Sequence, residues 1–128
     1  MATTKKIAVV DDDEIQTKAL SEELRDAGFE VCQAYDGEAG LAVVMKEMPD
    51  LVLLDIRMPK MDGITVLKEL KKSPTTKKIP VIIFTVMGTD DATLKAIAEC
   101  EPAFYLIKAD WQIKDIVKKV KEVLQLRY

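Results

Sequence analysis

Short apolar runs alternate with longer amphipathic segments along the whole chain. Five segments are strand-like, of which the first, third and fourth are uninterrupted apolar runs: residues 7–10, 29–34, 51–54, 81–84 and 103–107. Five segments carry apolar residues at helical spacing: residues 14–27, 37–48, 63–72, 90–99 and 110–126. The pattern therefore predicts five consecutive strand–helix units.

Such an alternation predicts a parallel sheet that is covered by helices on both faces. The three uninterrupted runs suit interior strands, whereas the segment 29–34 contains Glu30 and Gln33 and suits an edge. These assignments predict an α/β, flavodoxin-like (βα)5 doubly wound fold with the strand order 2-1-3-4-5. In this fold ligands bind beyond the carboxyl ends of the strands, where the order reverses between the first and third strands.

Polar or charged residues follow four of the five predicted strands. Asp11 and Asp12 come directly after the first strand, Asp55 after the third, Thr85 after the fourth and Lys108 after the fifth. Because the carboxyl ends of parallel strands meet at one edge of the sheet, we expect these five side chains to lie close together. A single Asp at a strand end is more often a helix cap or a loop residue, so the hypothesis of a site depends on the whole set.

The charges of this set favour a bound divalent cation. Two unit charges about 4 Å apart repel by roughly 4 kcal/mol at an effective dielectric constant of 20, so three clustered carboxylates are unstable alone. Lys108 offsets one of the three negative charges and leaves −2. Oxygen ligands without His or Cys favour Mg²⁺ over zinc or copper.

Composition excludes several other classes of protein. The 128 residues suit one domain, 1–128, with a net charge of −3. The chain has no His, which removes Ser-His-Asp triads and His metal sites, and Cys32 and Cys100 form no CxxC pair and are expected to be reduced thiols. No segment has the length and apolarity of a signal peptide or a membrane span, so we expect a cytoplasmic protein without membrane contact. The basic stretch 71–78 is interpreted as a solvated loop, and we expect no direct binding of nucleic acid.

Four motifs resemble those of the receiver domain of bacterial two-component response regulators, including the chemotaxis receivers. They are VVDDDE at 9–14, LVLLDIRMPKMDG at 51–63, IIFT at 82–85 and YLIK at 105–108. The resemblance covers the whole chain, and the string from Asp55 to Gly63 is its most specific part.

The resemblance implies a metal site with four contributors. Asp12 would bind Mg²⁺ directly and Asp11 directly or through water. The carboxylate of Asp55 and the backbone carbonyl of Arg57 would complete the protein ligands.

The same resemblance implies the roles of the remaining residues. Asp55 would be the phosphoacceptor, which takes a phosphoryl group from a phosphohistidine and forms an acyl phosphate. Lys108 and Thr85 would contact phosphoryl oxygens, and Thr85 with Tyr105 would form the conformational switch.

The implied partners are proteins. A sensor histidine kinase or a phosphotransfer protein would donate the phosphoryl group. An unknown downstream protein would bind the face formed by the segments 90–99, 103–107 and 110–126, and a homodimer stays an open alternative. The protein would catalyse only its own phosphorylation and dephosphorylation, so we do not expect an enzyme. Since the chain stops after its last helix, we expect either a stand-alone regulator or a receiver cut from a larger protein.

Two residues depart from the family pattern. Ala109 follows Lys108 where the family usually has a proline, often in a cis peptide; cis before Ala costs about 2.5–4 kcal/mol, so we predict a trans bond. Val86 follows Thr85 where a small residue is usual, and we predict that its bulk slows phosphoryl turnover.

Two further residues have a structural interpretation. Asp13 begins the helical segment 14–27 with the form of a capping residue, in contrast to its neighbours Asp11 and Asp12. Trp111 is the only tryptophan, and we favour packing of the last helix on the sheet over a role as a partner's anchor.

Two other functions stay open on the sequence. Asp11 and Asp13 form a D-x-D pair like that of haloacid dehalogenase-type phosphohydrolases, although Ile15 stands where a Thr is usual and a cap domain has no room. A receiver that never accepts phosphate and acts only as a docking module is the second alternative, and the departures at Val86 and Ala109 keep it open.

Overall fold

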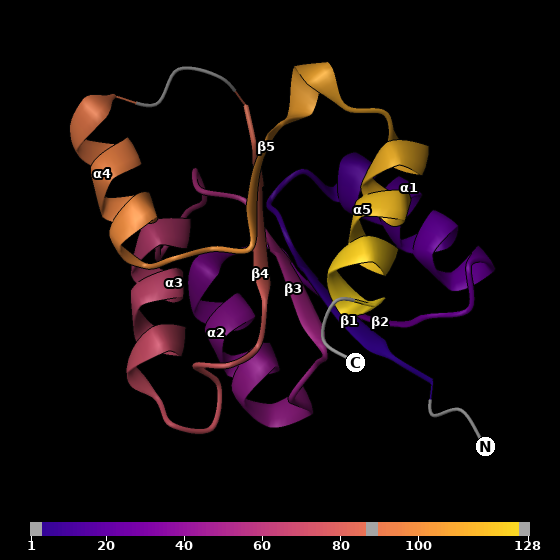
Figure 1. The fold of residues 1–128 in the computed structure, drawn as a ribbon, viewed down its shortest axis with the longest axis horizontal. Helices are drawn as coiled ribbons and strands as arrows, with labels where there is room; N and C mark the ends of the chain where they lie inside the picture. Colours follow the sequence, from indigo (N-terminus) through magenta and orange to yellow (C-terminus); the bar gives the residue numbers. More distant parts are fainter. Residues whose placement is uncertain (1–3, 87–89, 126–128) are drawn as a thin grey trace.

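A five-stranded parallel sheet forms the centre of the protein, with the order β2-β1-β3-β4-β5 (Figure 1). The computed structural model describes residues 4–86 and 90–125 of the chain. The strands are β1 (Lys6–Val10), β2 (Glu30–Ala34), β3 (Leu51–Leu54), β4 (Val81–Thr85) and β5 (Phe104–Ile107). The helices are α1 (Glu14–Asp26), α2 (Gly37–Glu47), α3 (Gly63–Lys72), α4 (Asp91–Glu99) and α5 (Ile113–Gln125), with a short 3₁₀ helix, η1 (Lys108–Asp110). The predicted fold and strand order are confirmed.

Two hydrophobic layers cover the sheet. Because successive side chains of a strand point to opposite faces, Ile7 and Val9 join the layer under α1 and α5, whereas Ala8 and Val10 join the layer under α2, α3 and α4. Figure 1 shows the same division, with α1 and α5 on one side of the sheet and the other three helices on the opposite side. Each large aliphatic side chain in these layers contributes about 1.5–3 kcal/mol through burial.

The three interior strands are apolar on both faces, as their sequences predict. Every described residue of β3 and β4 is buried, and so are residues 7–10 of β1. The edge strands β2 and β5 are partly exposed. None of the described helices is long and apolar enough to cross a bilayer. Cys32 and Cys100 are half-buried free thiols, as expected.

The last helix begins later than the sequence predicts. The predicted helix covered 110–126, but residues 108–110 form η1, Trp111 is extended (φ −128°, ψ 132°) and α5 starts at Ile113. The apolar positions that indicated the helix start at Ile113, so the pattern itself gave no support to residues 110–112. Residue 126 lies outside the described part of the chain, and the other predicted elements agree with the observed bounds to within one residue.

An Asp precedes each of the first four helices and caps it. The side chain of each accepts a hydrogen bond from the backbone N–H three residues further on, which satisfies one of the unpaired donors of the first turn. The capping residues are Asp13, Asp36, Asp62 and Asp90. The predicted role of Asp13 is confirmed: its Oδ1 lies 3.0 Å from the backbone nitrogen of Gln16.

Replacing Asp13 with Ala should lower the free energy of unfolding by about 1 kcal/mol, because the cap of α1 is lost. Mg²⁺ affinity should change little, since Asp11 is contacted by the backbone N–H of residue 13 and not by its side chain. Urea unfolding with and without Mg²⁺ measures both quantities. Asp26→Ala is the matched control: this exposed Asp ends α1, and its loss should stay within about 0.5 kcal/mol. A large loss of Mg²⁺ affinity in Asp13→Ala would contradict the separation of the two roles.

Candidate functional site

The carboxyl ends of the two central strands bring two aspartates side by side. Val10 of β1 pairs with Leu54 of β3, so the next residues, Asp11 and Asp55, follow neighbouring strands at the same edge. The backbone N–H of Asp55 donates to the carbonyl of Val10 over 2.9 Å, which fixes the relative position of the two strand ends. Both aspartates are buried, and the sequence prediction that they meet is confirmed.

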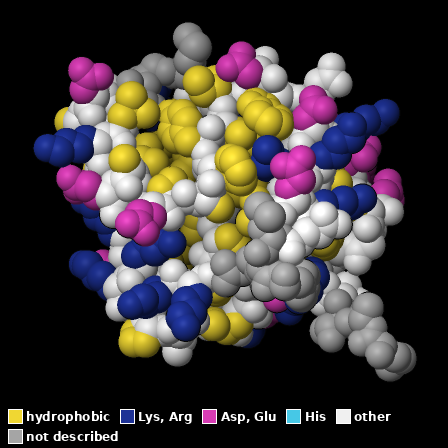
Figure 2. Space-filling model, in the orientation of Figure 1, with side chains coloured by type: hydrophobic (Ala, Val, Ile, Leu, Met, Phe, Trp, Pro, Cys, Tyr) yellow, Lys and Arg dark blue, Asp and Glu magenta, His cyan; other side chains and the backbone are white. Residues whose placement is uncertain are grey.

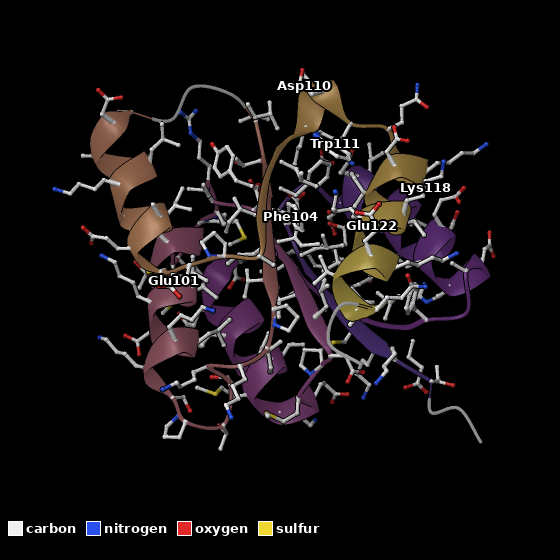
Figure 3. The ribbon with its side chains drawn as sticks, in the orientation of Figure 1. Glu101, Phe104, Asp110, Trp111, Lys118 and Glu122 are labelled. Carbon is white, nitrogen blue, oxygen red and sulfur yellow. The ribbon has the colours of Figure 1, made fainter. Side chains whose placement is uncertain are left out.

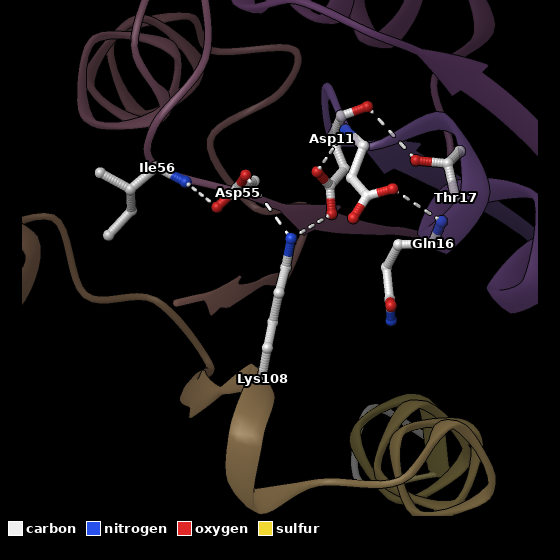
Figure 4. A network of polar contacts seen from close by, with 7 residues as sticks. Asp11, Gln16, Thr17, Asp55, Ile56 and Lys108 are labelled. Carbon is white, nitrogen blue, oxygen red and sulfur yellow. Dashed lines mark hydrogen bonds and ion pairs between the residues drawn. The ribbon is translucent and has the colours of Figure 1, made fainter. Parts of the chain in front are cut away.

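Lys108 reaches both carboxylates from the opposite side of the site (Figure 4). Its Nζ lies 2.7 Å from Asp11 Oδ2 and 3.7 Å from Asp55 Oδ2. The ammonium also lies 5.6 Å from the ring centre of Phe84, within the range of a cation–π contact. Because its side chain is only 16% exposed, Lys108 acts on the carboxylates with little screening by water.

Backbone groups hold each carboxylate by its other oxygen. Asp11 Oδ1 accepts a hydrogen bond from the N–H of Asp13 over 3.0 Å, and Asp55 Oδ1 accepts one from the N–H of Ile56 over 2.8 Å. The hydroxyl of Thr17, in α1, donates to the backbone carbonyl of Asp11 over 3.2 Å. The second oxygen of each aspartate is thereby left facing Lys108, so the site is organised before any ligand binds.

The ionisation of the pair follows from burial and contact. Burial raises the pKa of the Asp11 carboxyl above its usual value, although the hydrogen bonds from Lys108 and Asp13 act in the opposite direction. Desolvation alone would lower the pKa of Lys108, but the hydrogen bond to Asp11 and the charges of Asp11 and Asp55 outweigh it and raise that pKa. Lys108 therefore stays charged at neutral pH.

Asp12 completes a cluster of three carboxylates. Oxygen atoms of Asp11, Asp12 and Asp55 lie within 4.8 Å of one another, and Asp12 is the exposed member. All the donors are hard oxygens with one side open to water, which fits Mg²⁺, an ion that keeps several waters and takes few carboxylates. The donor set therefore fits the ion that the sequence predicted.

The loop after β3 is fixed by a glycine that admits no side chain. The N–H of Gly63 donates to the carbonyl of Ile56 over 2.7 Å, and a Cβ at Gly63 would overlap the backbone oxygen of Asp55. Arg57 is exposed and lies inside the loop that this contact closes. The structure thus places the predicted backbone ligand in a loop tied to the carboxyl end of β3.

Thr85 and Tyr105 lie on one face of the sheet. Thr85 ends β4, is buried and pairs with Ile107, so it stands beside the residue that precedes Lys108. Strand alternation places Thr85 on the same face as Ile83, whose partner in β5 is Tyr105. Tyr105 is half-buried and packs against the hydrophobic layer under α2, α3 and α4. The two predicted switch residues are therefore neighbours on that side.

Comparison with known proteins identifies the family. The sequence profile described as "Response regulator receiver domain" matches residues 7–121. The chain belongs to the response regulator receiver family. The site residues, from Asp11 to Lys108, all lie inside the matched range.

Relatives and solved structures agree with this assignment. The chain is 44% identical over 82 residues to the response regulator PleD of Caulobacter vibrioides. The aligned segment covers 64% of the chain and 18% of PleD. It resembles a CheY-like receiver from Methanospirillum hungatei with a TM-score of 0.88 and 27% identity, covering 96% of the chain and 95% of that structure. It also resembles the signal receiver domain of a histidine kinase from Syntrophus aciditrophicus, with a TM-score of 0.85 and 26% identity. That likeness covers 95% of the chain and 91% of the solved structure. The chain spans less than half the length of the curated relatives that it matches.

Two departures of this receiver can be followed in the structure. The peptide between Lys108 and Ala109 is trans, as predicted, since the described residues contain no cis peptide. Lys108 reaches the carboxylates with this trans bond, so Ala109 does not prevent the contact. Val86 is 48% exposed directly after Thr85, and its effect on turnover stays a prediction.

Sequence reasoning missed two positioning residues of the receiver and placed a third correctly. Thr17 and Gly63 were not singled out, although a Thr on the apolar side of α1 is a signal for a buried hydrogen bond. Trp111 packs against the hydrophobic layer under α1 and α5, which confirms the preferred interpretation, but it precedes α5 instead of belonging to it.

Replacing Lys108 with Met should raise the Mg²⁺ affinity of the receiver by about tenfold, or about 1.4 kcal/mol. The ammonium competes with the cation for Asp11 and repels it, and one charge contact is worth about 1–4 kcal/mol at this range. Isothermal titration at pH 8 measures the affinity. In the wild-type protein the affinity should fall as pH drops through the raised pKa of Asp11, because a protonated carboxyl does not bind Mg²⁺.

Lys114→Met controls for the change in net charge, since Lys114 is an exposed residue of α5. Its Mg²⁺ affinity should equal that of the wild type. An unchanged or lower affinity in Lys108→Met would show that Lys108 does not compete for the site.

Proposed function

We propose that this receiver accepts a phosphoryl group on Asp55 from the phosphohistidine of a sensor kinase or a phosphotransfer protein, with Mg²⁺ bound. The observation that carries the proposal is the placement of Lys108 between the buried carboxylates of Asp11 and Asp55, beside a third carboxylate from Asp12. The one ammonium and the cation site together can neutralise both the nucleophile and the incoming phosphoryl oxygens.

The geometry supports the following step. An oxygen of Asp55 attacks phosphorus, the P–N bond to the histidine breaks and the imidazole leaves with the electron pair and takes up a proton. Phosphoryl transfer depends mainly on positioning and charge stabilisation. Asp55 Oδ1 is fixed by the N–H of Ile56, which leaves Oδ2 as the attacking atom on the side of Lys108. Asp11, Asp12, Asp55 and the carbonyl of Arg57 would hold Mg²⁺, which when bound would neutralise negative charge on the transferred group. The protein acts on itself alone and turns over no separate substrate.

The proposed output is a change of conformation on the α4–β5–α5 face. Phosphorylation brings Asp55 from −1 to near −2, which attracts Lys108 and the hydroxyl of Thr85. Thr85 and Tyr105 share one face of the sheet, so movement of the first changes the space available to the second. Next to Tyr105 lies an apolar groove of about 520 Å³ between α4 and β5, lined by Leu94, Ala98 and Phe104 among others. Figure 2 shows hydrophobic side chains gathered over this region. We infer that the downstream protein binds here.

The structure does not support the phosphohydrolase alternative, because Asp11 and Asp13 do not act as a pair. Its D-x-D pair would need the carboxylates of Asp11 and Asp13 to act together. The carboxylate of Asp13 instead accepts a hydrogen bond from the N–H of Gln16 and caps α1, and Asp13 is exposed. The partner of Asp11 in the site is Asp55, which supports the receiver chemistry.

Incubation with Mg²⁺ and a small acyl phosphate should add a single phosphoryl group to the wild-type protein. Intact mass spectrometry detects the adduct, and hydroxylamine should remove it because it is an acyl phosphate. Asp55→Ala should give no adduct, whereas Asp62→Ala, the cap of α3, is the matched control and should be phosphorylated. A wild-type protein that stays unmodified with this donor and with phosphohistidine donors would favour the docking module.

Val86→Ala should accelerate both gain and loss of the phosphoryl group by about threefold, or about 0.6 kcal/mol in the barrier. The shorter side chain leaves more room beside Thr85 for water or donor. The decay of the intact-mass adduct over time gives the rate. Val31→Ala, in the edge strand β2, is the control and should leave the rate unchanged. Equal rates in Val86→Ala and wild type would refute the steric argument.

A further inference from the structure

The backbone that carries Lys108 is held only weakly by its own turn. Lys108 opens η1, and the turn closes through a long hydrogen bond of 3.4 Å from the N–H of Trp111 to the carbonyl of Lys108. Ala109, inside the turn, places no restriction on the backbone of the kind a proline would. Yet the Nζ of Lys108 is placed 2.7 Å from Asp11. Beyond the pairing of Ile107 with Thr85 just before Lys108, a contact outside the turn can therefore help to place it.

Trp111 supplies an anchor directly after the turn. It is half-buried and packs against the hydrophobic layer under α1 and α5, the layer that also contains Phe84. Since only two residues separate Trp111 from Lys108, a fixed indole restricts where the backbone of Lys108 can lie. In Figure 3 Trp111 lies next to Asp110, the last residue of η1, beside β5.

Lys119 of α5 joins this anchor to the start of β5. Its Nζ lies 4.4 Å from the ring centre of Phe104 and 5.7 Å from that of Trp111, both within cation–π range. An ion pair of 3.0 Å with Glu122 holds the ammonium in place. Phe104 begins β5, and Trp111 follows the turn at the end of β5 (Figure 3). Lys119 therefore contacts both ends of the segment that presents Lys108.

We propose that Trp111, with Lys119 and Phe104, forms an aromatic clamp that positions Lys108 in the phosphorylation site. The three residues touch no reacting atom; they are positioning residues that act through the backbone of η1. The proposal rests on the proposed function for its effect on phosphorylation, but its effect on the contact between Lys108 and Asp11 is independent of any phosphoryl transfer.

The clamp makes a prediction with a distinctive sign. Lys108 competes with Mg²⁺ for Asp11, so loosening the clamp should strengthen Mg²⁺ binding, whereas general damage to the fold would weaken it. We expect Trp111→Ala to raise the Mg²⁺ affinity about threefold and to lower the rate of phosphorylation by the small acyl phosphate about tenfold. Trp111→Phe, which keeps an aromatic ring in the layer, should restore both values toward those of the wild type.

A double-mutant cycle with Lys108→Met separates positioning from packing. If Trp111 acts through Lys108, Trp111→Ala should have no effect on Mg²⁺ affinity in the Lys108→Met background. Titration calorimetry measures the four affinities, and thermal unfolding confirms that each variant is folded at the temperature used. Additive effects of the two substitutions would overturn the proposal.

Surface variants test the clamp without disturbing the hydrophobic layer. Lys119→Met keeps a long side chain but removes the cation. It should raise the Mg²⁺ affinity and lower the phosphorylation rate, as Trp111→Ala does, but by smaller factors. Lys118→Met is the matched control, since Lys118 is the exposed neighbour and should behave as wild type. Glu122→Gln removes the ion pair and leaves both rings. Its Mg²⁺ affinity and phosphorylation rate should therefore lie between those of Lys119→Met and Lys118→Met. Identical behaviour of Lys119→Met and Lys118→Met would exclude a role of the cation.

Failure of the clamp and failure of the proposed function give different results. If wild-type protein forms no acyl phosphate, the proposed function fails, while the Mg²⁺ cycle still tests the clamp. If wild-type protein is phosphorylated and Trp111→Ala reacts at the same rate with the same Mg²⁺ affinity, the clamp fails and the proposed function stands.

Discussion

The contact of Lys108 with Asp11 and Asp55 is the interaction on which the rest of the site depends. Two carboxylates at neighbouring strand ends, both buried, repel each other strongly in a medium of low dielectric constant. A single ammonium at 2.7 and 3.7 Å offsets part of this repulsion. In the proposed function the same ammonium also contacts the phosphoryl group. One residue would then both offset the charge of the buried carboxylates and take part in the proposed chemistry, and it would compete with Mg²⁺ for Asp11.

The order and the parallel pairing of the strands make this contact possible. Parallel pairing of β1 and β3 brings Asp11 and Asp55 together, and β5 delivers Lys108 from the other edge of the sheet. Backbone N–H groups of Asp13 and Ile56 direct the carboxylates, and Gly63 allows the following loop to approach the backbone of Asp55. Precise placement thus comes mostly from backbone groups, which the sequence alone does not display.

Much of the fold and the members of the site could be predicted from the sequence. Uninterrupted apolar runs identified the interior strands because a strand buried on both faces has no polar positions, and Asp13 was recognised as a cap by its place before a helix. The start of α5 was predicted three residues too early, since Asp110 and Trp111 are compatible with a helix. In the structure Asp110 ends η1, whereas Trp111 is extended and packs against the layer under α1 and α5. Thr17 was missed because a Thr on the apolar side of α1 indicates a buried hydrogen bond but does not identify its acceptor, here the carbonyl of Asp11 six residues away.

The sequence by itself determined which residues stand at the strand ends, because hydrophobic period and strand alternation are local properties that the order of residues fully contains. It also indicated the family, through the string of residues from Asp55 to Gly63. Only the tertiary structure decided that Lys108 holds Asp11 more closely than Asp55 and that Lys119 lies over Phe104 and Trp111. These are contacts between residues far apart along the chain, and their distances follow from how the helices pack on the sheet and not from any local pattern.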